Sequence, residues 1–294
     1  MVTQPPPNGD HRPFLLGLVG APIKHSASPA MHEAAAASLG RKALYQLIEI
    51  EGADEKKLRE LLDGVRDLGF AGVNVTYPYK EAIVPLLDSL SADAETMAAV
   101  NTIVVDHGRL SGHNTDVTGF ARAVAPLLTK STGPIAVIGA GGVGKAAAFA
   151  MVKVGATEIR IFDRDFRRTE TLGAMLHGLV RVRACRDIAE TLDGCRGAVN
   201  ATPVGMWPNR DSSIPPNLLH SGLWVSDAVY SPLWTPLLLA ARDAGAEVMT
   251  GRTLAINQAV DAFNLFTGLP APEAAMAAAF DAAIASRSVA TAAA

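Results

Sequence analysis

The ten residues VIGAGGVGKA, at positions 137–146, constrain the fold of this chain more than any other stretch. They follow an apolar run typical of a buried strand and lead into a stretch with helical spacing, and Gly139, Gly141 and Gly144 have the G-x-G-x-x-G spacing. In such a turn the first glycine permits a tight bend, the second lets the backbone approach a pyrophosphate, and the third lets the helix pack closely. A plain glycine-rich turn is the alternative, but the context favours a Rossmann-type dinucleotide site over Gly139, Ala140, Gly141, Gly142, Val143 and Gly144.

The next predicted strand ends in IFDRDFRR, residues 161–168, where acids and bases stand close together. A carboxylate at Asp163 suits the two hydroxyls of an NAD ribose and would repel the 2′-phosphate of NADP. Arg164 and Arg168 would suit that phosphate, or they could stack on adenine or pair with the pyrophosphate. We expect Asp163 to decide, which predicts NAD as the cofactor and weaker use of NADP. The alternative is that Asp163 only caps a turn.

Strand and helix patterns alternate along both halves of the chain, which predicts an α/β fold with two domains. We expect a disordered tail over residues 1–12, a first α/β domain with a largely parallel sheet over residues 13–116, and the Rossmann domain over residues 117–254. Helices over residues 255–288 are expected to pack back onto the first domain. The pattern after Pro78 also predicts a helix over residues 80–87.

Composition excludes several classes of protein. Hydrophobic residues make up 49% of the 294 residues and the net charge is -3, so nothing indicates nucleic-acid or anionic-membrane binding. Cys185 and Cys195 fit neither a disulfide framework nor a zinc pattern, and no metal site is expected. No apolar run reaches the roughly 18–20 residues that cross a bilayer, and no signal sequence is visible. By elimination we expect a cytoplasmic protein that acts on small molecules.

Polar residues gather in three strings of the first domain, at the ends of apolar runs. Because residues just past the carboxyl ends of strands line the ligand crevice of an open α/β sheet, these hydroxyl, amide, ammonium and carboxylate groups suit a small polyhydroxylated acid. Each residue alone also has a plain explanation as a helix cap, a turn residue or a solvated helix start. The strings are HSASP (Ser26, Ser28), NVTYPYKE (Thr76, Lys80) and AVNT with GHNTD (Asn101, Asp116).

Together with GAGGVG, NATPVGM and a late glutamine, these strings resemble the motifs of the shikimate dehydrogenase family, in the family's order, from about Gly17 to Gly268. The strings NTDVTGF, VIGAGGVGKA and GRTLAINQAVDAFNLFTGL are most similar to the branch that accepts quinate as well as shikimate and prefers NAD. The resemblance implies a substrate domain and a Rossmann domain with a cleft between them. It also implies reversible hydride transfer between a nicotinamide and the ring carbon that is a ketone in 3-dehydroshikimate and an alcohol in shikimate.

Roles follow from the resemblance, residue by residue. Ser26 and Ser28 would hold the substrate carboxylate, and Lys80 and Asp116 would flank the reacting oxygen. By the same motifs, the ring hydroxyls would be bound by Thr76, Asn101 and Gln258. Tyr230 would lie near the substrate, and the cofactor would pass Thr202, Val229 and Gly251.

The pair of Lys80 and Asp116 has a chemical rationale. Removal of a hydride from an alcohol carbon requires removal of the hydroxyl proton, and in the reverse direction an ammonium group is a ready proton donor. We therefore predict that Lys80 is the acid/base and that Asp116 orients it and shares the substrate hydroxyl. The chemistry requires no metal, because the ammonium can polarise the carbonyl.

The sequence departs from the commoner family pattern at two places. Val117 and Thr118 stand between the NTD aspartate and Gly119, and LAIN stands where methionine and leucine usually precede the late glutamine. These departures leave the preference between shikimate and quinate open. An NADP-dependent biosynthetic shikimate dehydrogenase is the alternative enzyme, and a dinucleotide-sensing regulator is the alternative outside enzymes. We expect a monomer or a homodimer.

Overall fold

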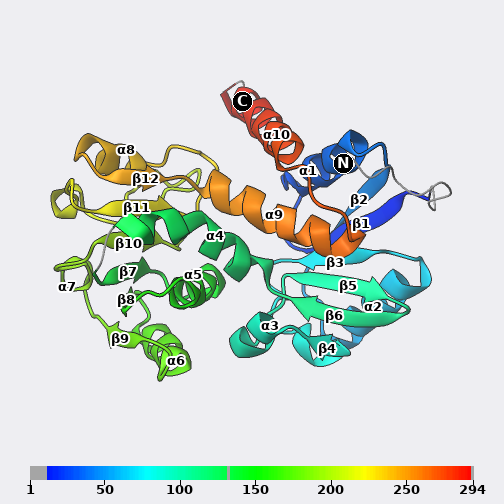
Figure 1. Ribbon diagram of the computed structural model, residues 1–294, viewed down its shortest axis with the longest axis horizontal. Coiled ribbons are helices and arrows are strands. Elements are labelled where there is room, and N and C mark those ends of the chain that lie inside the picture. Colours follow the sequence, from blue (N-terminus) through cyan, green and yellow to red (C-terminus); the bar gives the residue numbers. More distant parts are fainter. Residues whose placement is uncertain (1–11, 131–132, 293–294) are drawn as a thin grey trace, which may run out of the picture. The chain divides into compact units, whose positions relative to one another are not determined.

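The computed structural model describes residues 12–130 and 133–292, and it divides into two compact units (Figure 1). Unit 1 consists of Met1–Asn114 and Ala259–Ala294, and unit 2 is Thr115–Gln258. The predicted tail over residues 1–12 lies outside the described residues except for Arg12. Within the described ranges, no helix combines the length and apolar character needed to cross a membrane.

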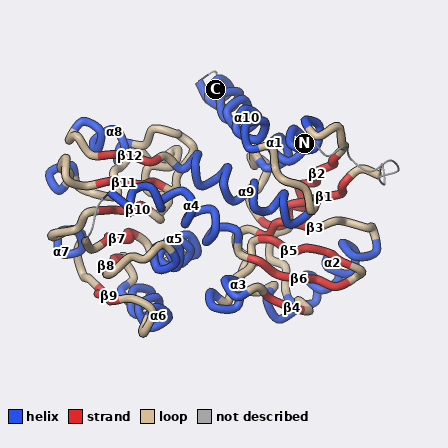
Figure 2. Tube along the Cα trace, viewed as in Figure 1, coloured by secondary structure: helices blue, strands red, loops and turns tan. Residues whose placement is uncertain are grey.

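Unit 1 contains a mixed sheet with the strand order β2-β1-β3-β5-β6-β4 (Figure 2). β1 pairs in parallel with β2 and with β3, whereas β5 runs antiparallel to both β3 and β6, with His107 and Gly108 in the turn between β5 and β6. The elements before the unit boundary are β1 Phe14–Gly20, α1 Ser28–Ser38, β2 Ala43–Glu49, α2 Glu55–Asp67, β3 Gly72–Val75, the 3-10 helix Val84–Leu86, β4 Ser89–Leu90, α3 Ala92–Met97, β5 Thr102–Asp106 and β6 Arg109–His113.

The helix α2 illustrates how the sequence specifies these elements. Asp54 caps its N-terminus, because the Asp54 carboxylate accepts a hydrogen bond from Lys57 N at 2.8 Å. Leu58, Leu62 and Val65 follow at helical spacing and are buried in one hydrophobic cluster with Val73 of β3. The charged residues between them face solvent, so one stripe of α2 covers the sheet.

The prediction of a helix over residues 80–87 is wrong. Lys80 lies in a turn, and only a short 3-10 helix, Val84–Leu86, follows it. The physical reason is Pro85, which has no N–H to donate to Glu81 O and so cannot continue an α-helix through this stretch. Lys80 is therefore held by a turn rather than by a helix.

Unit 2 is a doubly wound Rossmann fold with an entirely parallel strand order, β12-β11-β10-β7-β8-β9. The order reverses between β7 and β10, which is the position where sheets of this type bind ligands. α4 and α7 are missing from the sequence-based prediction. The elements are α4 Thr115–Lys130, β7 Ile135–Ile138, α5 Gly142–Lys153, β8 Glu158–Phe162, α6 Phe166–Leu176, β9 Arg181–Ala184, α7 Ile188–Leu192, β10 Gly197–Asn200, the 3-10 helix Pro216–Leu218, β11 Trp224–Asp227, α8 Pro236–Asp243 and β12 Glu247–Met249.

The end of the chain completes unit 1. α9, Gly251–Thr267, passes the boundary at Gln258 and Ala259, and its last turns bury Phe266 among the apolar side chains of β1. α10, Glu273–Ala292, packs against α1 (Figure 1). A Cβ at Gly72 of β3 would overlap the Phe266 ring and Ile103 O, so the close approach of α9 to the sheet requires glycine there.

This contact yields a prediction for stability. Gly72→Ala should lower the free energy of unfolding by about 2–3 kcal/mol, because the new methyl group overlaps backbone and a buried ring. Chemical denaturation measures the change. Gly64→Ala in α2 is the matched control: nothing described lies within 4 Å of its added Cβ, and alanine should stabilise the helix by up to roughly 1 kcal/mol. Equal stability of the two variants would contradict the prediction.

Candidate functional site

The glycine-rich turn between β7 and α5 contains glycines that the protein itself requires. Gly139 has a φ of +102°, and a Cβ there would lie 2.8 Å from Thr202 Cγ2. A Cβ at Gly144 would overlap Gly139 O, so α5 can begin beside the turn only without a side chain at this position. Packing alone therefore explains the first and last glycines of the motif.

Gly141 and Gly142 are different, because packing does not explain them. No described atom lies within 4 Å of a Cβ built at either residue, and the φ of Gly141 is −78°, which any residue can adopt. The space in front of this backbone lies at the N-terminus of α5, where unpaired N–H groups attract anions. The residues present fit a pyrophosphate that needs this space.

Asp163 joins the glycine-rich turn to the end of β8. Its Oδ2 accepts a hydrogen bond from Ala140 N at 2.8 Å, and its Oδ1 accepts one from Asp165 N at 2.9 Å. Asp163 does cap the turn after β8, which was the alternative to a ribose contact. It also holds the glycine-rich turn, through Ala140 N. A carboxylate has about four acceptor positions, so these two bonds leave capacity for the hydroxyls of a ribose.

The neighbouring charged residues divide into two groups. Arg167 pairs with Asp165 at 3.2 Å, and its hydrogen bonds hold the pKa of Asp165 below its usual range. Asp165 also caps α6 by accepting a hydrogen bond from Arg167 N. Arg164 and Arg168 are exposed at the same end of β8. Asp165 is thus engaged within its own loop, and Asp163 is the acid nearest the glycine-rich turn.

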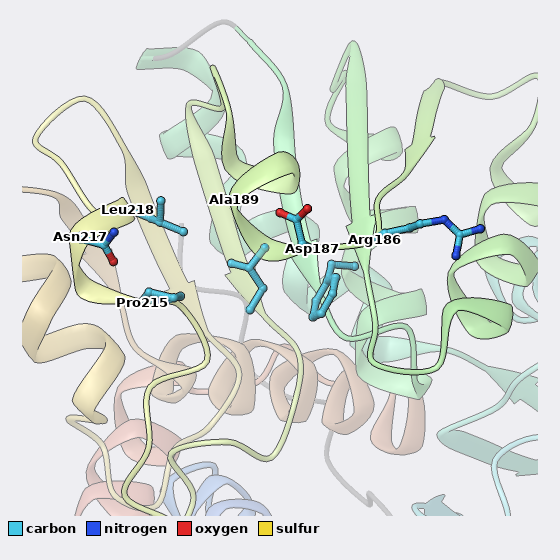
Figure 3. A pocket seen from close by; sticks show the side chains of 8 residues that line it. Arg186, Asp187, Ala189, Pro215, Asn217 and Leu218 are labelled. Atoms are coloured by element: carbon cyan, nitrogen blue, oxygen red, sulfur yellow. The ribbon is translucent and has the colours of Figure 1, made fainter.

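A pocket of about 470 Å³ lies in unit 2 (Figure 3). Figure 3 shows Arg186 on one side of it and Pro215, Asn217 and Leu218 on the other. Phe162, the last residue of β8, also lines it and directly precedes Asp163. The pocket thus lies beside the end of β8, and none of the predicted site residues lines it.

Asp227, at the end of β11, organises the loops that follow β10 and β11. The buried carboxylate accepts hydrogen bonds from Asn200 Nδ2 at 2.8 Å, from Val229 N at 2.9 Å and from Thr235 Oγ1 at 2.7 Å. Asn200 Oδ1 in turn accepts from Thr202 N at 3.1 Å and from Thr202 Oγ1 at 2.7 Å. The sequence analysis missed Asp227; the signal available was a carboxylate inside the buried strand LWVSDAV.

The hydrogen bonds of Asp227 bring predicted cofactor residues together. Thr202 lies against Gly139, and Val229 lies against Gly251, where an added Cβ would be 2.5 Å from Val229 O. The half-buried Tyr230 follows directly. Residues from four separate segments of unit 2 thus surround the carboxyl ends of β7, β10 and β11.

In unit 1, the two serines after β1 contact each other. Ser26 Oγ donates a hydrogen bond to Ser28 Oγ at 3.0 Å and accepts one from Ser28 N at 3.2 Å. The N-cap of α1 is Ala27, and no side chain caps this helix. Ser28 is therefore not a helix cap, and both hydroxyls are half-buried at the carboxyl end of β1.

Backbone hydrogen bonds bring the other predicted residues of unit 1 to the same edge of the sheet. Val75 N donates to Asn101 O at 2.8 Å, and Val100 N donates to Lys80 O at 2.8 Å. Thr76 and Lys80 thus lie on the loop after β3, beside the segment that carries Asn101 into β5. The loop after β1 joins them through a bond from Ala21 N to Tyr77 O at 3.0 Å.

A buried hydrogen-bond network runs beneath these residues. Tyr45 OH, on β2, donates a hydrogen bond to Asn74 Oδ1 at 2.8 Å. Asn74 Nδ2 donates to Asn101 O at 3.1 Å and to Thr102 Oγ1 at 3.0 Å. The sequence analysis missed Tyr45, Asn74 and Thr102, because each lies in a strand whose apolar pattern indicated only core packing.

Asp116 and Gln258 lie on α4 and α9 within unit 2. The two helices approach closely at Gly119, where an added Cβ would be 2.6 Å from Gln258 N. Arg122 donates to Asn257 O at 2.7 Å and so holds the crossing together. Asp116 lies one helical turn before Gly119, on the same face of α4. Asp116 and Gln258 belong to unit 2, whereas Ser26, Ser28, Thr76, Lys80 and Asn101 belong to unit 1.

Comparison with known proteins identifies close relatives. A family model described as the shikimate dehydrogenase substrate binding domain matches residues 18–103. A quinate/shikimate dehydrogenase (NAD(+)) of Corynebacterium efficiens is 42% identical over 269 residues, which cover 88% of this chain and 95% of the relative. A shikimate dehydrogenase (NADP(+)) of Pelodictyon phaeoclathratiforme is 42% identical over 266 residues, covering 88% and 93%. The structure of quinate dehydrogenase from Corynebacterium glutamicum in complex with NAD has a TM-score of 0.85 at 40% identity, covering 92% of this chain and 99% of that chain.

The buried carboxylate of Asp227 predicts a pH-dependent contribution to stability. Burial raises its pKa to about 6 from the usual 3.8, against the effect of its three hydrogen bonds. A raised pKa in the folded state stabilises the fold below the unfolded-state pKa, and this stability is lost as the pH rises through the folded value. The free energy of unfolding of the wild type, relative to Asp227→Asn, should therefore fall by on the order of 2–3 kcal/mol between about pH 4 and pH 7.

Urea unfolding at several pH values measures this difference. Asp243→Asn, which changes an exposed acid at the end of α8, is the control and should show no such trend. A wild-type advantage that stays constant or grows with pH would contradict the prediction.

Proposed function

This chain belongs to the shikimate dehydrogenase family, and from that premise we propose that it is an oxidoreductase that oxidises shikimate to 3-dehydroshikimate reversibly with NAD. We propose quinate as a second substrate, oxidised to 3-dehydroquinate. Two of the relatives described above, one of them solved with NAD, carry quinate in their names. The observation that carries the choice of NAD is the position of Asp163 at the glycine-rich turn.

Asp163 supports NAD for an electrostatic reason. Its carboxylate is fixed by Ala140 N and Asp165 N at the place where the ribose edge of a dinucleotide lies in a Rossmann fold. A ribose with two free hydroxyls can donate to that carboxylate, whereas a 2′-phosphate would be repelled. The exposed Arg164 and Arg168 at the same end of β8 support weaker use of NADP.

Unit 1 supplies most of the groups that bind the acid in this proposal. Ser26 and Ser28 donate hydrogen bonds to the carboxylate of shikimate or quinate, Thr76 and Asn101 bind ring hydroxyls, and Gln258 of unit 2 binds a further ring hydroxyl. Both serine side chains are small, which suits the additional hydroxyl that quinate carries beside its carboxylate. Tyr230 lies near the ring, and Thr202, Val229 and Gly251 lie along the cofactor.

The reaction consists of a hydride transfer and a proton transfer. Oxidation moves the hydride of the ring carbon, with both electrons of the C–H bond, to the nicotinamide that bound NAD supplies. Lys80 accepts the proton of the hydroxyl as the C=O bond forms, and in reduction its ammonium returns that proton to the alkoxide. Asp116 orients Lys80 and shares the substrate hydroxyl.

We further propose a cytoplasmic enzyme with small-molecule partners only, acting as a monomer or a homodimer. The net charge of -3 supports this choice, because it offers no basic surface for nucleic acid or anionic membranes.

Cofactor choice gives the direct test of the proposed function. Steady-state assays with shikimate and quinate, each with NAD and NADP, should show a higher kcat/KM with NAD. Asp163→Asn should raise the NADP/NAD ratio of kcat/KM by about tenfold, because it removes the repelling charge and one ribose acceptor. Asparagine keeps one oxygen for the backbone, so it disturbs the turn less than alanine. Activity with neither acid would refute the proposed function. The control Asp243→Asn should leave the NADP/NAD ratio unchanged, and an equally unchanged ratio in Asp163→Asn would show that Asp163 does not select the cofactor.

Lys80→Ala tests the chemistry. Loss of the acid/base should lower kcat by about 10²–10⁴-fold while KM for shikimate changes far less. Lys56→Ala, an exposed lysine on α2, is the control and should keep full activity. A large rise in KM with kcat intact would show that Lys80 only binds the substrate.

A further inference from the structure

Asn74 is buried, and its side-chain amide makes hydrogen bonds through both of its polar atoms. Its Nδ2 donates to Asn101 O and to Thr102 Oγ1, at 3.1 and 3.0 Å, so both of its N–H groups are used. Its Oδ1 is then the atom left to face Tyr45 OH, 2.8 Å away. Since that oxygen can only accept, the phenol of Tyr45 must donate.

The same reasoning gives the direction of the next hydrogen bonds. The phenol has a single proton, which goes to Asn74 Oδ1. Beyond Asn74, Thr102 Oγ1 accepts from Asn74 Nδ2 and donates to Asn101 Oδ1 at 3.0 Å. The bonds therefore form one donor chain from Tyr45, through Asn74 and Thr102, to Asn101.

Helix α1 holds Tyr45 at the start of this chain. The His32 ring stacks on the Tyr45 ring, with centroids 4.9 Å apart and 26° between the planes, and Glu33 Oε1 accepts from Tyr45 N at 3.0 Å. Burial lowers the pKa of His32 to about 3 and raises that of Tyr45 far above its usual value. His32 is therefore a neutral ring, and Tyr45 keeps the proton that it donates.

We infer that Tyr45, Asn74 and Thr102 are positioning residues that fix the amide of Asn101 in one orientation. The inference rests on the proposed function, in which Asn101 binds a ring hydroxyl. Because Thr102 engages Asn101 Oδ1, the amide is set with its N–H groups directed away from Thr102, as donors for a ligand oxygen.

The donor chain predicts a specific pattern in kinetics. Tyr45→Phe keeps the ring on His32 but removes the hydrogen bond to Asn74, and it should lower kcat/KM for shikimate by about tenfold while KM for NAD stays within about twofold. In a Thr102→Val background the same substitution should cost less than about threefold, because the chain is already broken between Asn74 and Asn101. Ser38→Ala, at the end of α1, provides the matched background, in which Tyr45→Phe should keep its full effect.

Thr102 provides a second test that does not depend on the folding of Tyr45→Phe. Thr102→Val removes the hydroxyl at nearly constant volume and should lower kcat/KM for shikimate about tenfold. Thr102→Ser restores the hydroxyl and should recover most of that loss. Thermal unfolding of each variant separates a loss of positioning from a loss of folded protein.

Three outcomes would overturn the inference. The first is a kcat/KM for shikimate that stays within about twofold in both Tyr45→Phe and Thr102→Val, even where Tm falls. The second is a Tyr45→Phe effect that is equal in the Thr102→Val and Ser38→Ala backgrounds. The third is a wild-type protein that oxidises neither acid with NAD, which would remove the proposed function itself and is distinguished from the others by that assay alone.

Discussion

Buried polar atoms must have hydrogen-bond partners, and both halves of this protein are organised by that requirement. Each unit carries an asparagine near the end of a central strand, Asn74 in β3 and Asn200 in β10. Each amide bonds to one end of another strand of the same sheet: Asn74 to Asn101 and Thr102 where β5 begins, and Asn200 to Asp227, the last residue of β11. The loops that carry the binding residues are therefore held by side chains that no ligand needs to touch. Substitution of either asparagine would therefore remove hydrogen bonds at the end of another strand.

The glycines of the glycine-rich turn serve two purposes, which are close packing of the protein and room for a ligand, and the structure tells them apart. Gly139 and Gly144 are required by the contacts of the turn with Thr202 and with itself. Gly141 and Gly142 face space, and their backbone would accept a side chain without a clash with described atoms. The G-x-G-x-x-G spacing treats Gly139, Gly141 and Gly144 alike, but of these only Gly141, with its neighbour Gly142, indicates a ligand. This distinction supports a phosphate cradle more strongly than the motif does.

Much of the fold follows from local patterns, and its exceptions have physical causes. The alternation of strand and helix patterns predicted the α/β fold and the Rossmann unit, and the parallel strand order of unit 2 confirms the latter. α4 was not predicted because Gly119 and Pro126 interrupt its pattern, and the helix over residues 80–87 fails because of Pro85. The structure holds these deviations through tertiary contacts that a short window of sequence does not contain.

The candidate site was predictable where a motif carries it and not where partners are distant in sequence. Asp163 was visible because its spacing from the glycines is fixed by a strand–helix–strand unit. Tyr45 and Asn74 are 29 residues apart, and Asn200 and Asp227 are 27 apart, so nothing in the sequence indicates that they bond. The sequence pattern of each strand indicates that these four residues are core positions. Whether they form hydrogen bonds with one another depends on the register of the sheets, which only the structure supplies.

The return of α9 and α10 to unit 1 has a consequence for the order of synthesis. Unit 2 is one continuous segment, so the ribosome makes all of it before the last piece of unit 1. Until Phe266 emerges, β1 and β3 lack the ring that packs closely against Gly72. Translation that stops before this point leaves an apolar surface exposed, which favours aggregation. The half of the protein that begins the chain is thus the last to be completed.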